Sequence, residues 1–367
     1  FTSLLFNKKK QVVNSRYITT DESLAALCNE IEDGDIVAID TEFIRRTTYF
    51  PILSLIQVGH KGNISVIDCL SKKMDIVPIL EIINNSKIKK ILHSASQDLE
   101  IFYQQTSLKP KNIEDTQILA NFSGFDFNSS YARLTKDICG VRLDKQMQNS
   151  NWLKRPLTNS QIEYAEIDVV YLEKIYKKLV KKVEKKDLLD SYYQDVDMLI
   201  DSLSSNNINS LFKPFIKGRR KIFKQNKVPI QKVYDLLLWR DNAAKKIDKP
   251  RRHLISDENL ELFILEKKVS LRLGEKLQKS LDELMEKSEY MPDTEGKDYN
   301  IGYDKKEFVI IREELIKMAK KYGVDERSVI SSTDLQGVFY QGKGYSNLTK
   351  WRIAMVDQLK NKFGYEK

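Results

Sequence analysis

The sequence predicts an α/β domain with a mixed sheet flanked by helices, followed by a region that is entirely helical. Four short runs rich in Ile, Leu and Val, each bounded by turn residues, predict strands at 36–39, 53–58, 64–67 and 88–92. Helical patterns alternate with or follow these runs at 76–85, 98–105, 115–122 and 130–138. From about residue 229 onward only helical periodicity is found, which separates the two regions.

The strand runs differ in how they are joined. The segment 59–63 (GHKGN) between the second and third runs has the composition of a hairpin turn, so part of the sheet should be antiparallel. A long helix is predicted over 160–185, where Thr158 and Gln161 have the spacing of a capping box. A polar and then basic stretch predicts an interdomain linker, and a second polar break follows at 288–304. The predicted domains are therefore 1–205, a basic linker 206–228, 229–290 and 305–367.

The charge balance favours an acidic partner. The chain of 367 residues has 61 Lys and Arg against 52 Asp and Glu, a formal net charge of +9. Phosphate contacts release counterions, so such a surplus favours binding to nucleic acid. Lysine-rich proteins that bind nothing acidic share this composition, and that alternative stays open.

Cysteine and histidine usage restricts the kinds of site that the chain can build. The three cysteines are far apart and form no C-x-x-C pair, which indicates no disulfide partner and a reducing, cytoplasmic setting. Three histidines are too few for a histidine-rich metal centre, so a metal would be held by carboxylates, which select Mg²⁺ or Mn²⁺. The sequence has no apolar run of membrane-spanning length, so no membrane partner is expected.

Two acids stand at the end of the first predicted strand. Asp40 and Glu42 are two residues apart and therefore point to the same face of a strand. Adjacent carboxylates repel and raise each other's pKa unless a cation neutralises them. The alternative is that the strand ends at Asp40 and both acids are solvated in a loop.

Further acids lie on predicted helices. Tyr164 and Asp168 are four residues apart and share a helix face that continues in apolar residues, where an unpaired carboxylate would be costly. A metal ion would relieve that cost, and so would a Lys or Arg partner. Asp98 falls in the first turn of its helix, where the helix dipole favours an acid whatever its function. His93, which closes a strand, could equally be a satisfied buried imidazole.

Taken together and in this order, these motifs resemble the DEDD exonuclease superfamily, in the subgroup whose last motif carries a tyrosine. Within it, the chain is similar to the ribonuclease D family. The similarity extends to FIRRTTYFP at 43–51, LIQ at 55–57, DTQILA at 115–120, LDK at 143–145 and NWLKRPL at 151–157. It implies a ribonuclease-H-like fold with Asp40, Glu42, Asp98 and Asp168 as metal ligands and Tyr164 as the family tyrosine.

This resemblance implies 3′→5′ removal of 5′-nucleoside monophosphates from RNA by hydrolysis with two divalent ions, Mg²⁺ or alternatively Mn²⁺. Asp40 would bridge the ions, and the Tyr164 hydroxyl would orient the attacking water. Phe43 is expected to stack on the terminal base, with core packing as the alternative. Lys145 and Arg155 are expected to contact phosphates, with solvated side chains as the alternative. His93 completes the predicted substrate contacts.

The helical region also shows a resemblance. Residues 233–260 resemble a first HRDC domain (helicase and ribonuclease D, C-terminal), and 307–367 a more divergent second one. Basic runs at 218–224 and 249–252 could line an RNA path or could be solvated faces. The expected partner is RNA, tRNA precursors above all, and the expected state is a monomer. The alternative functions are a 3′→5′ DNA exonuclease, which the same metal site would serve, and a non-catalytic RNA-binding protein.

Overall fold

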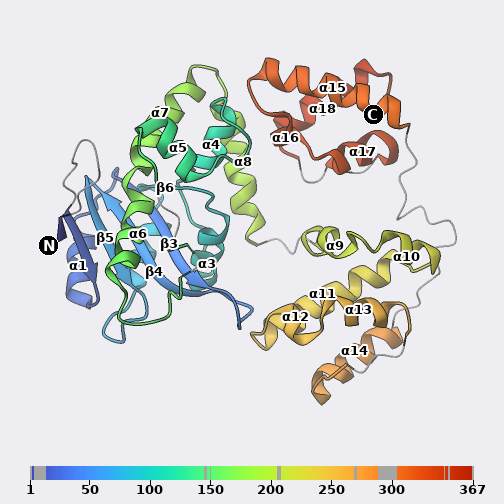
Figure 1. The fold of residues 1–367 in the computed structure, drawn as a ribbon, viewed down its shortest axis with the longest axis horizontal. Helices are drawn as coiled ribbons and strands as arrows, with labels where there is room; N and C mark the ends of the chain where they lie inside the picture. Colours follow the sequence, from blue (N-terminus) through green and yellow to red (C-terminus); the bar gives the residue numbers. More distant parts are fainter. Residues whose placement is uncertain are drawn as a thin grey trace. The chain divides into compact units, whose positions relative to one another are not determined.

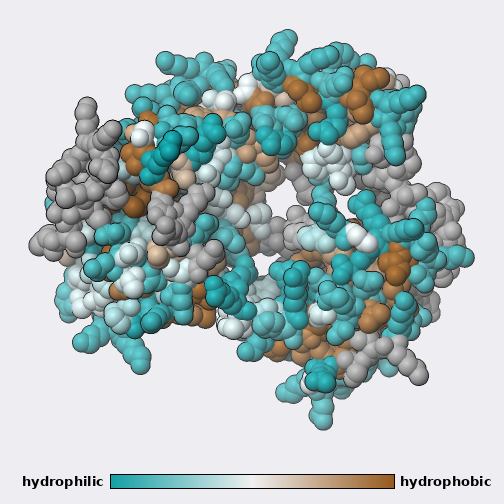
Figure 2. Space-filling model, in the orientation of Figure 1, coloured by the Kyte–Doolittle hydropathy of each residue, from teal (hydrophilic) through white to brown (hydrophobic). Residues whose placement is uncertain are grey.

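The fold is taken from a computed structural model, which describes residues 2–3, 14–143, 147–148, 150–204, 208–267, 271–287, 304–342, 344–345 and 348–365. The chain divides into two compact units. The first comprises Phe1–Ile44, Ile52–Leu203 and Asp304–Lys367, and the second Arg45–Pro51 and Ser204–Tyr303. Hydrophilic residues cover most of the face shown in Figure 2.

The first unit contains a seven-stranded mixed sheet of order β1-β2-β5-β4-β3-β6-β7 (Figure 1). β3, β6 and β7 run parallel, as do β2 and β5, whereas β4 is antiparallel to both of its neighbours and β1 to β2. The strands are β1 (Thr2–Ser3), β2 (Asn14–Ile18), β3 (Ile36–Ile44), β4 (Ile52–His60), β5 (Asn63–Asp68), β6 (Lys89–Leu92) and β7 (Ile113–Asp115). The predicted mixed sheet is confirmed.

The predicted hairpin turn joins β4 to β5. His60 pairs with Asn63 across it, and Lys61 and Gly62 between them have φ of 48° and 82°. Positive φ at both central residues is the geometry that matches the twist of antiparallel strands, and Gly62 adopts it without steric cost.

Helices flank the sheet, and α6 crosses one face of it (Figure 1), in contact with β3, β4 and β5. Gly59 on β4 lies at this contact: a Cβ there would be 3.5 Å from the Val169 carbonyl oxygen of α6, an ordinary contact distance, and 3.2 Å from the Cβ of Ala38 on the neighbouring strand, a tight one. The helices before residue 203 are α1 (Asp21–Asn29), α2 (Val77–Asn84), α3 (Ser96–Thr106), α4 (Thr116–Phe122), α5 (Tyr131–Leu134), the π-helical turn η1 (Thr135–Cys139), α6 (Asn159–Val170), α7 (Leu172–Glu184) and α8 (Leu189–Ser202).

The predicted single helix over 160–185 is wrong in one respect, because it is broken at Tyr171 into α6 and α7. The start is as expected, with the Thr158–Gln161 capping box present. The break has a local cause: the Tyr131 hydroxyl donates to the Ile167 carbonyl (2.9 Å) and accepts from the Tyr171 N–H (3.1 Å). These two backbone groups would bond each other in a continuous helix, and a side chain inserted there bends the ladder.

The second unit is helical and includes the segment predicted as a linker. Its helices are α9 (Ile208–Ile216), α10 (Arg220–Gln225), α11 (Ile230–Lys246), α12 (Arg251–Leu254), α13 (Asp257–Ile264) and α14 (Glu275–Lys287). Phe212, Phe215 and Phe223 from 206–228 are buried in its core with Leu236 and Leu260. Residues of the expected basic linker therefore contribute apolar side chains to a packed core.

The final helices belong to the first unit, where they pack on α8. They are α15 (Lys305–Tyr322), α16 (Glu326–Val329), α17 (Ser332–Gln341) and α18 (Lys350–Lys362). Arg352 forms an ion pair with the buried Asp195 of α8, and Trp351 stacks on Tyr322 and meets the edge of Phe122. The domain boundaries proposed from the sequence stay predictions. Within the described part of the chain, no helix has both the length and the apolar character needed to cross a bilayer.

Candidate active site

Three acids from two elements converge in the first unit. Asp40 and Glu42 lie on β3 and Asp168 on α6, and each offers a carboxylate oxygen within 4.8 Å of the others. The strand continues past Asp40 to Ile44, so the two acids are not in a loop. No Lys or Arg of the described residues forms an ion pair with Asp168, which removes the support for the structural alternative.

The cluster holds its negative charge at high electrostatic cost. Burial raises the pKa of Asp40 well above its usual range, and the nearby charges of Asp168, Asp98 and Glu42 raise it further. Burial, together with the charges of Asp168 and Asp98, raises the pKa of Glu42 to about 9. Carboxylates in this state bind either protons or a cation. The hard oxygen donors fit a divalent ion such as Mg²⁺ or Mn²⁺.

Asp98 stands beside these three acids but is not one of the convergent set. It lies in the first turn of α3, as predicted, and its Oδ1 accepts a short hydrogen bond from the buried hydroxyl of Thr41. Burial raises the pKa of Asp98 despite this bond. Sequence reasoning missed Thr41, whose only signal is its place between the two acids of the strand.

Asp115 links α3 to the neighbouring strand end. It caps α4 by accepting from the N–H groups of Gln117 and Ile118. It also accepts from the N–H of Ser94 (3.1 Å) and of Ala95 (2.8 Å), immediately before α3 begins. One carboxylate thus ties the start of the helix that carries Asp98 to β7.

The tyrosine faces the acid cluster. Burial raises the pKa of Tyr164, and the charges of Asp168, Glu42 and Asp40 raise it further. The phenol therefore stays protonated and can donate a hydrogen bond, but it is a poor general base. The centre of the Trp152 ring lies 6.1 Å from that of the Tyr164 ring.

Two buried polar side chains next to the acids are missing a partner. Gln57 pairs with Asp40 across β3 and β4, which puts both side chains on one face of the sheet. It is fully buried, yet neither amide atom has a hydrogen-bond partner. The buried Trp152 Nε1 also has none, although its N–H is near enough to Glu42 to lower the pKa of that carboxyl. Groups of this kind cost stability unless a bound species satisfies them.

The four residues predicted to contact the substrate differ in how the structure places them. Phe43 follows a register shift in β3 after Glu42, the kind of irregularity that redirects a side chain near an active site. His93 forms a hydrogen bond with Thr116 through Nδ1 (2.9 Å) and leaves Nε2 without a partner, while burial lowers the pKa of His93 to about 4.

The two predicted phosphate contacts are Arg155 and Lys145. Arg155 forms a bidentate ion pair with Asp68 and a hydrogen bond with Ser54, which leaves its predicted phosphate contact without support. Lys145 lies outside the described residues.

Comparison with known proteins identifies the family. Residues 15–184 match a family model described as 3′-5′ exonuclease, a metal-dependent family. Ribonuclease D of Zymomonas mobilis is 30% identical over 356 residues, which cover 91% of this chain and 90% of that protein. The chain belongs to the ribonuclease D family.

Ribonuclease D of Acidiphilium cryptum is 32% identical over 244 residues, 66% of this chain, and this match spans only 61% of the length of that relative. A solved structure of Escherichia coli RNase D, described as an exoribonuclease involved in structured RNA processing, is 27% identical. It covers 96% of this chain and 100% of its own, with a TM-score of 0.75. This similarity confirms the predicted fold class, in which the helical C-terminal region is consistent with HRDC domains.

Proposed function

We propose that this protein is a 3′→5′ exoribonuclease that releases 5′-nucleoside monophosphates from RNA. The observation that carries the proposal is the convergence of Asp40, Glu42 and Asp168 beside the Tyr164 hydroxyl. Membership of the ribonuclease D family supports it. The substrates proposed are structured RNAs with single-stranded 3′ tails, above all tRNA precursors, and the chain is proposed to act as a cytoplasmic monomer.

The acids would hold two divalent ions, with Mg²⁺ as the proposed ion and Mn²⁺ as an alternative. Asp40, Glu42, Asp98 and Asp168 would hold these ions. When bound, such ions supply charge neutralisation for the phosphate and a lowered pKa for the attacking water.

Side chains of the protein itself would position the attacking water and the substrate. Tyr164 would donate its hydroxyl proton to a hydrogen bond that orients the water in line with the scissile bond. Phe43 would stack on the terminal base, a contact worth about 1–3 kcal/mol. His93, neutral at pH 7 because burial lowers its pKa, is proposed as a further substrate contact. Lys145 is proposed to contact phosphate.

Asp168→Asn tests the proposal. Loss of one ligand charge should remove several kcal/mol of transition-state stabilisation, on the order of a 10³-fold loss of rate. The measurement is release of labelled nucleotide from 3′-labelled tRNA precursors in Mg²⁺, in Mn²⁺ and with chelator. Glu163→Gln, an exposed acid on the same helix, is the matched control and should retain full activity.

Cleavage by Asp168→Asn at the wild-type rate would refute the metal-site assignment. If the wild type binds RNA but releases no nucleotide in either metal, the non-catalytic alternative holds. Matched RNA and DNA oligonucleotides address the second alternative, because a DNA exonuclease would cleave the strand without 2′-hydroxyl groups at least as fast.

A further inference from the structure

A network of hydrogen bonds ties the loop that precedes α6 to the sheet of the first unit. Asp68 is the last residue of β5, and Arg155 belongs to the loop. Arg155 Nε and Nη2 donate to the two carboxylate oxygens of Asp68, at 2.7 and 2.6 Å. The Tyr17 hydroxyl and the Leu70 N–H also donate to Asp68, at 2.7 and 3.0 Å. Arg155 is therefore held by a carboxylate that is itself fixed.

Arg155 and Ser54 both bind the backbone of Trp152. The Ser54 hydroxyl, on β4, donates to the Trp152 carbonyl (2.5 Å), and Arg155 Nη1 donates to the same oxygen (2.7 Å). Arg155 Nη2 also donates to the Ser54 hydroxyl oxygen (3.1 Å). Hydrogen bonds with a charged donor are roughly twice as strong as neutral ones. The position of the Trp152 backbone is therefore set by the sheet and not by the loop alone.

The side chain of Trp152 reaches from this anchor to the acid cluster. The residue is 1% exposed, and its ring stands beside that of Tyr164. Its Nε1–H has no hydrogen-bond partner, yet it lies near enough to Glu42 to lower the pKa of that carboxyl. A buried indole N–H usually finds an acceptor. Glu42 can serve without any route from solvent, because it is a side chain of the same protein.

The same loop is bonded to the helix that carries the other half of the site. The Oε1 atom of Gln161 accepts from the Thr158 N–H (3.1 Å) in the capping box of α6. The Nε2 atom of Gln161 donates to the Asn151 carbonyl (3.5 Å). The loop is thus connected to the sheet on one side and to the start of the helix with Tyr164 and Asp168 on the other.

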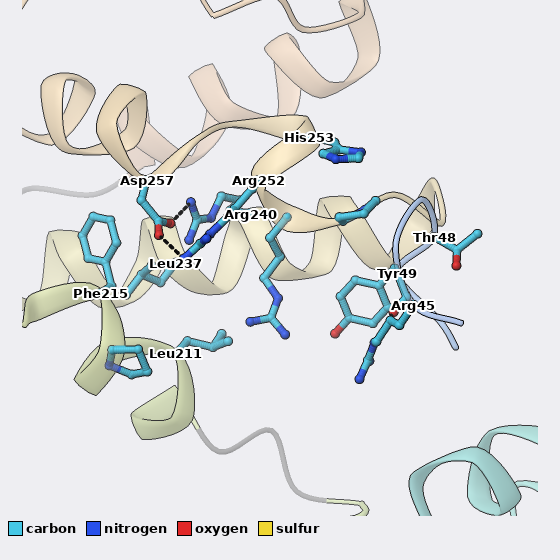
Figure 3. A pocket seen from close by; sticks show the side chains of 13 residues that line it. Arg45, Thr48, Tyr49, Leu211, Phe215, Leu237, Arg240, Arg252, His253 and Asp257 are labelled. Carbon is cyan, nitrogen blue, oxygen red and sulfur yellow. Dashed lines mark hydrogen bonds and ion pairs between the residues drawn. The ribbon is translucent and has the colours of Figure 1, made fainter. Parts of the chain in front are cut away.

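A buried Arg–Asp pair that also binds a carbonyl can serve packing alone. The second unit contains such a pair, in which Arg240 bonds Asp257 (Figure 3) and donates to the Ile255 carbonyl. Packing is the alternative explanation for Arg155 as well. The difference is that the carbonyl bound by Arg155 belongs to Trp152, whose ring lies at the acid cluster.

We propose that Trp152 is a positioning residue of the metal site: its Nε1–H donates to Glu42 when that carboxylate binds a divalent ion. Arg155 and Ser54 hold Trp152 in the position that this bond requires. The inference rests on the proposed function, since it assigns the groups that orient one of the proposed metal ligands. A carboxylate that gives one oxygen to an ion keeps the other free to accept a hydrogen bond, and such bonds orient metal ligands.

Trp152→Phe tests this bond, because it keeps an aromatic ring in the loop and removes the N–H. We expect the Mn²⁺ affinity of the full chain, measured by calorimetric titration without RNA, to fall about tenfold. Trp351→Phe is the matched control, because it makes the same change at a buried tryptophan whose Nε1 donates to Asp195 (2.9 Å). It should leave the Mn²⁺ affinity unchanged. Equal affinities of Trp152→Phe and the wild type would overturn the proposal.

The indole N–H resonances of ¹⁵N-labelled protein give a direct readout. The Trp152 signal is identified by its absence from Trp152→Phe. In the wild type it should move downfield on titration with Mg²⁺, because the N–H gains a charged acceptor. The signals of Trp239 and Trp351, whose N–H groups donate to Ser280 and Asp195, should stay in place. A Trp152 signal that stays in place while Mg²⁺ raises the Tm would overturn the proposal, since a purely structural role predicts that result.

Ser54→Ala tests the support of Trp152 and remains informative if Trp152→Phe fails to fold. It removes one of the two donors to the Trp152 carbonyl, so the Mn²⁺ affinity should fall about threefold and the Mg²⁺-induced shift of the indole signal should shrink. Ser123→Ala, at another buried serine of this unit that donates to the Leu119 carbonyl (2.8 Å), is the matched control and should change neither. Unchanged affinity and shift in Ser54→Ala would overturn the role given to the network.

These measurements separate the proposal from the exonuclease activity, because none of them requires hydrolysis. Failure of the exonuclease proposal would appear as absence of nucleotide release from a wild type that binds Mn²⁺. The indole shift and the affinities of the variants would still decide the role of Trp152.

Discussion

The two units of this protein compensate buried charge in different ways. In the first unit Asp40, Glu42 and Asp168 converge, and burial and mutual repulsion raise their pKa values, so protons compete with a cation for these oxygens. In the second unit the guanidinium of Arg240 cannot give up its proton, and built-in acids compensate part of the charge. The carboxylate site should therefore respond to pH and to divalent cations, whereas the Arg240–Asp257 ion pair should not respond to divalent cations.

The largest effect that separates the two sites is expected in stability against pH. Carboxyls whose folded pKa lies above the unfolded value of about 4 favour the folded state below that pH. This contribution is lost as pH rises from about 4 toward the value of about 9 for Glu42. Stabilisation by Mg²⁺ should accordingly grow with pH and reach about 2.7 kcal/mol at a free concentration of 100 Kd, roughly 5–10 °C in Tm.

Thermal melts in chelator and in Mg²⁺ across this pH range measure the effect. Asp168→Asn should reduce the Mg²⁺-induced shift and its pH dependence. Lys90 titrates in the opposite sense, because burial lowers its pKa to about 7, so the difference between the two metal conditions, in which its contribution cancels, is the quantity to compare. A shift of equal size at low and high pH would mean that the acid cluster is not the site of binding.

The sequence predicted much of the acid site because its signals are local. Alternation along a strand places Asp40 and Glu42 on one face, and a spacing of four places Tyr164 and Asp168 together on a helix. The convergence of strand and helix came from the family resemblance. The contact of the segment Arg45–Pro51 with α11 was beyond prediction, because Tyr49 and Asp241 meet only through the fold. The segment 206–228 shows a related limit: its charges predicted a linker, and the burial of its phenylalanines in a core could not be derived from those charges.

A smaller effect should follow from the buried amide beside Asp40. We expect Gln57→Leu to weaken Mn²⁺ binding by about tenfold, because the unpartnered amide beside Asp40 is free to hydrogen-bond the acids or the hydrated ion once the metal is bound. The same change should leave the metal-free chain as stable or more stable, since it removes two unsatisfied polar atoms. Calorimetric titration with Mn²⁺ and thermal melts in chelator measure both quantities.

Gln104→Leu is the matched control, since its buried Oε1 is also unpartnered but lies six residues beyond Asp98 along α3. It should leave Mn²⁺ affinity unchanged. If Gln57→Leu destabilises the metal-free chain without altering Mn²⁺ affinity, Gln57 serves packing and the cation site depends on the acids alone.

The smallest effect is expected from the break between α6 and α7. Tyr131→Phe keeps the ring and removes the hydroxyl that separates Ile167 from Tyr171, so these backbone groups can bond each other and straighten the helix next to Asp168. One net hydrogen bond is worth about 1 kcal/mol, so Mn²⁺ affinity should fall about fivefold. Hydrogen exchange at the Tyr171 amide should slow at the same time. Tyr322→Phe, which loses a hydroxyl bond to Ser191 instead, should change neither. Unaltered exchange and affinity in Tyr131→Phe would mean that packing of α6 on the sheet, at Gly59, is enough to place Asp168.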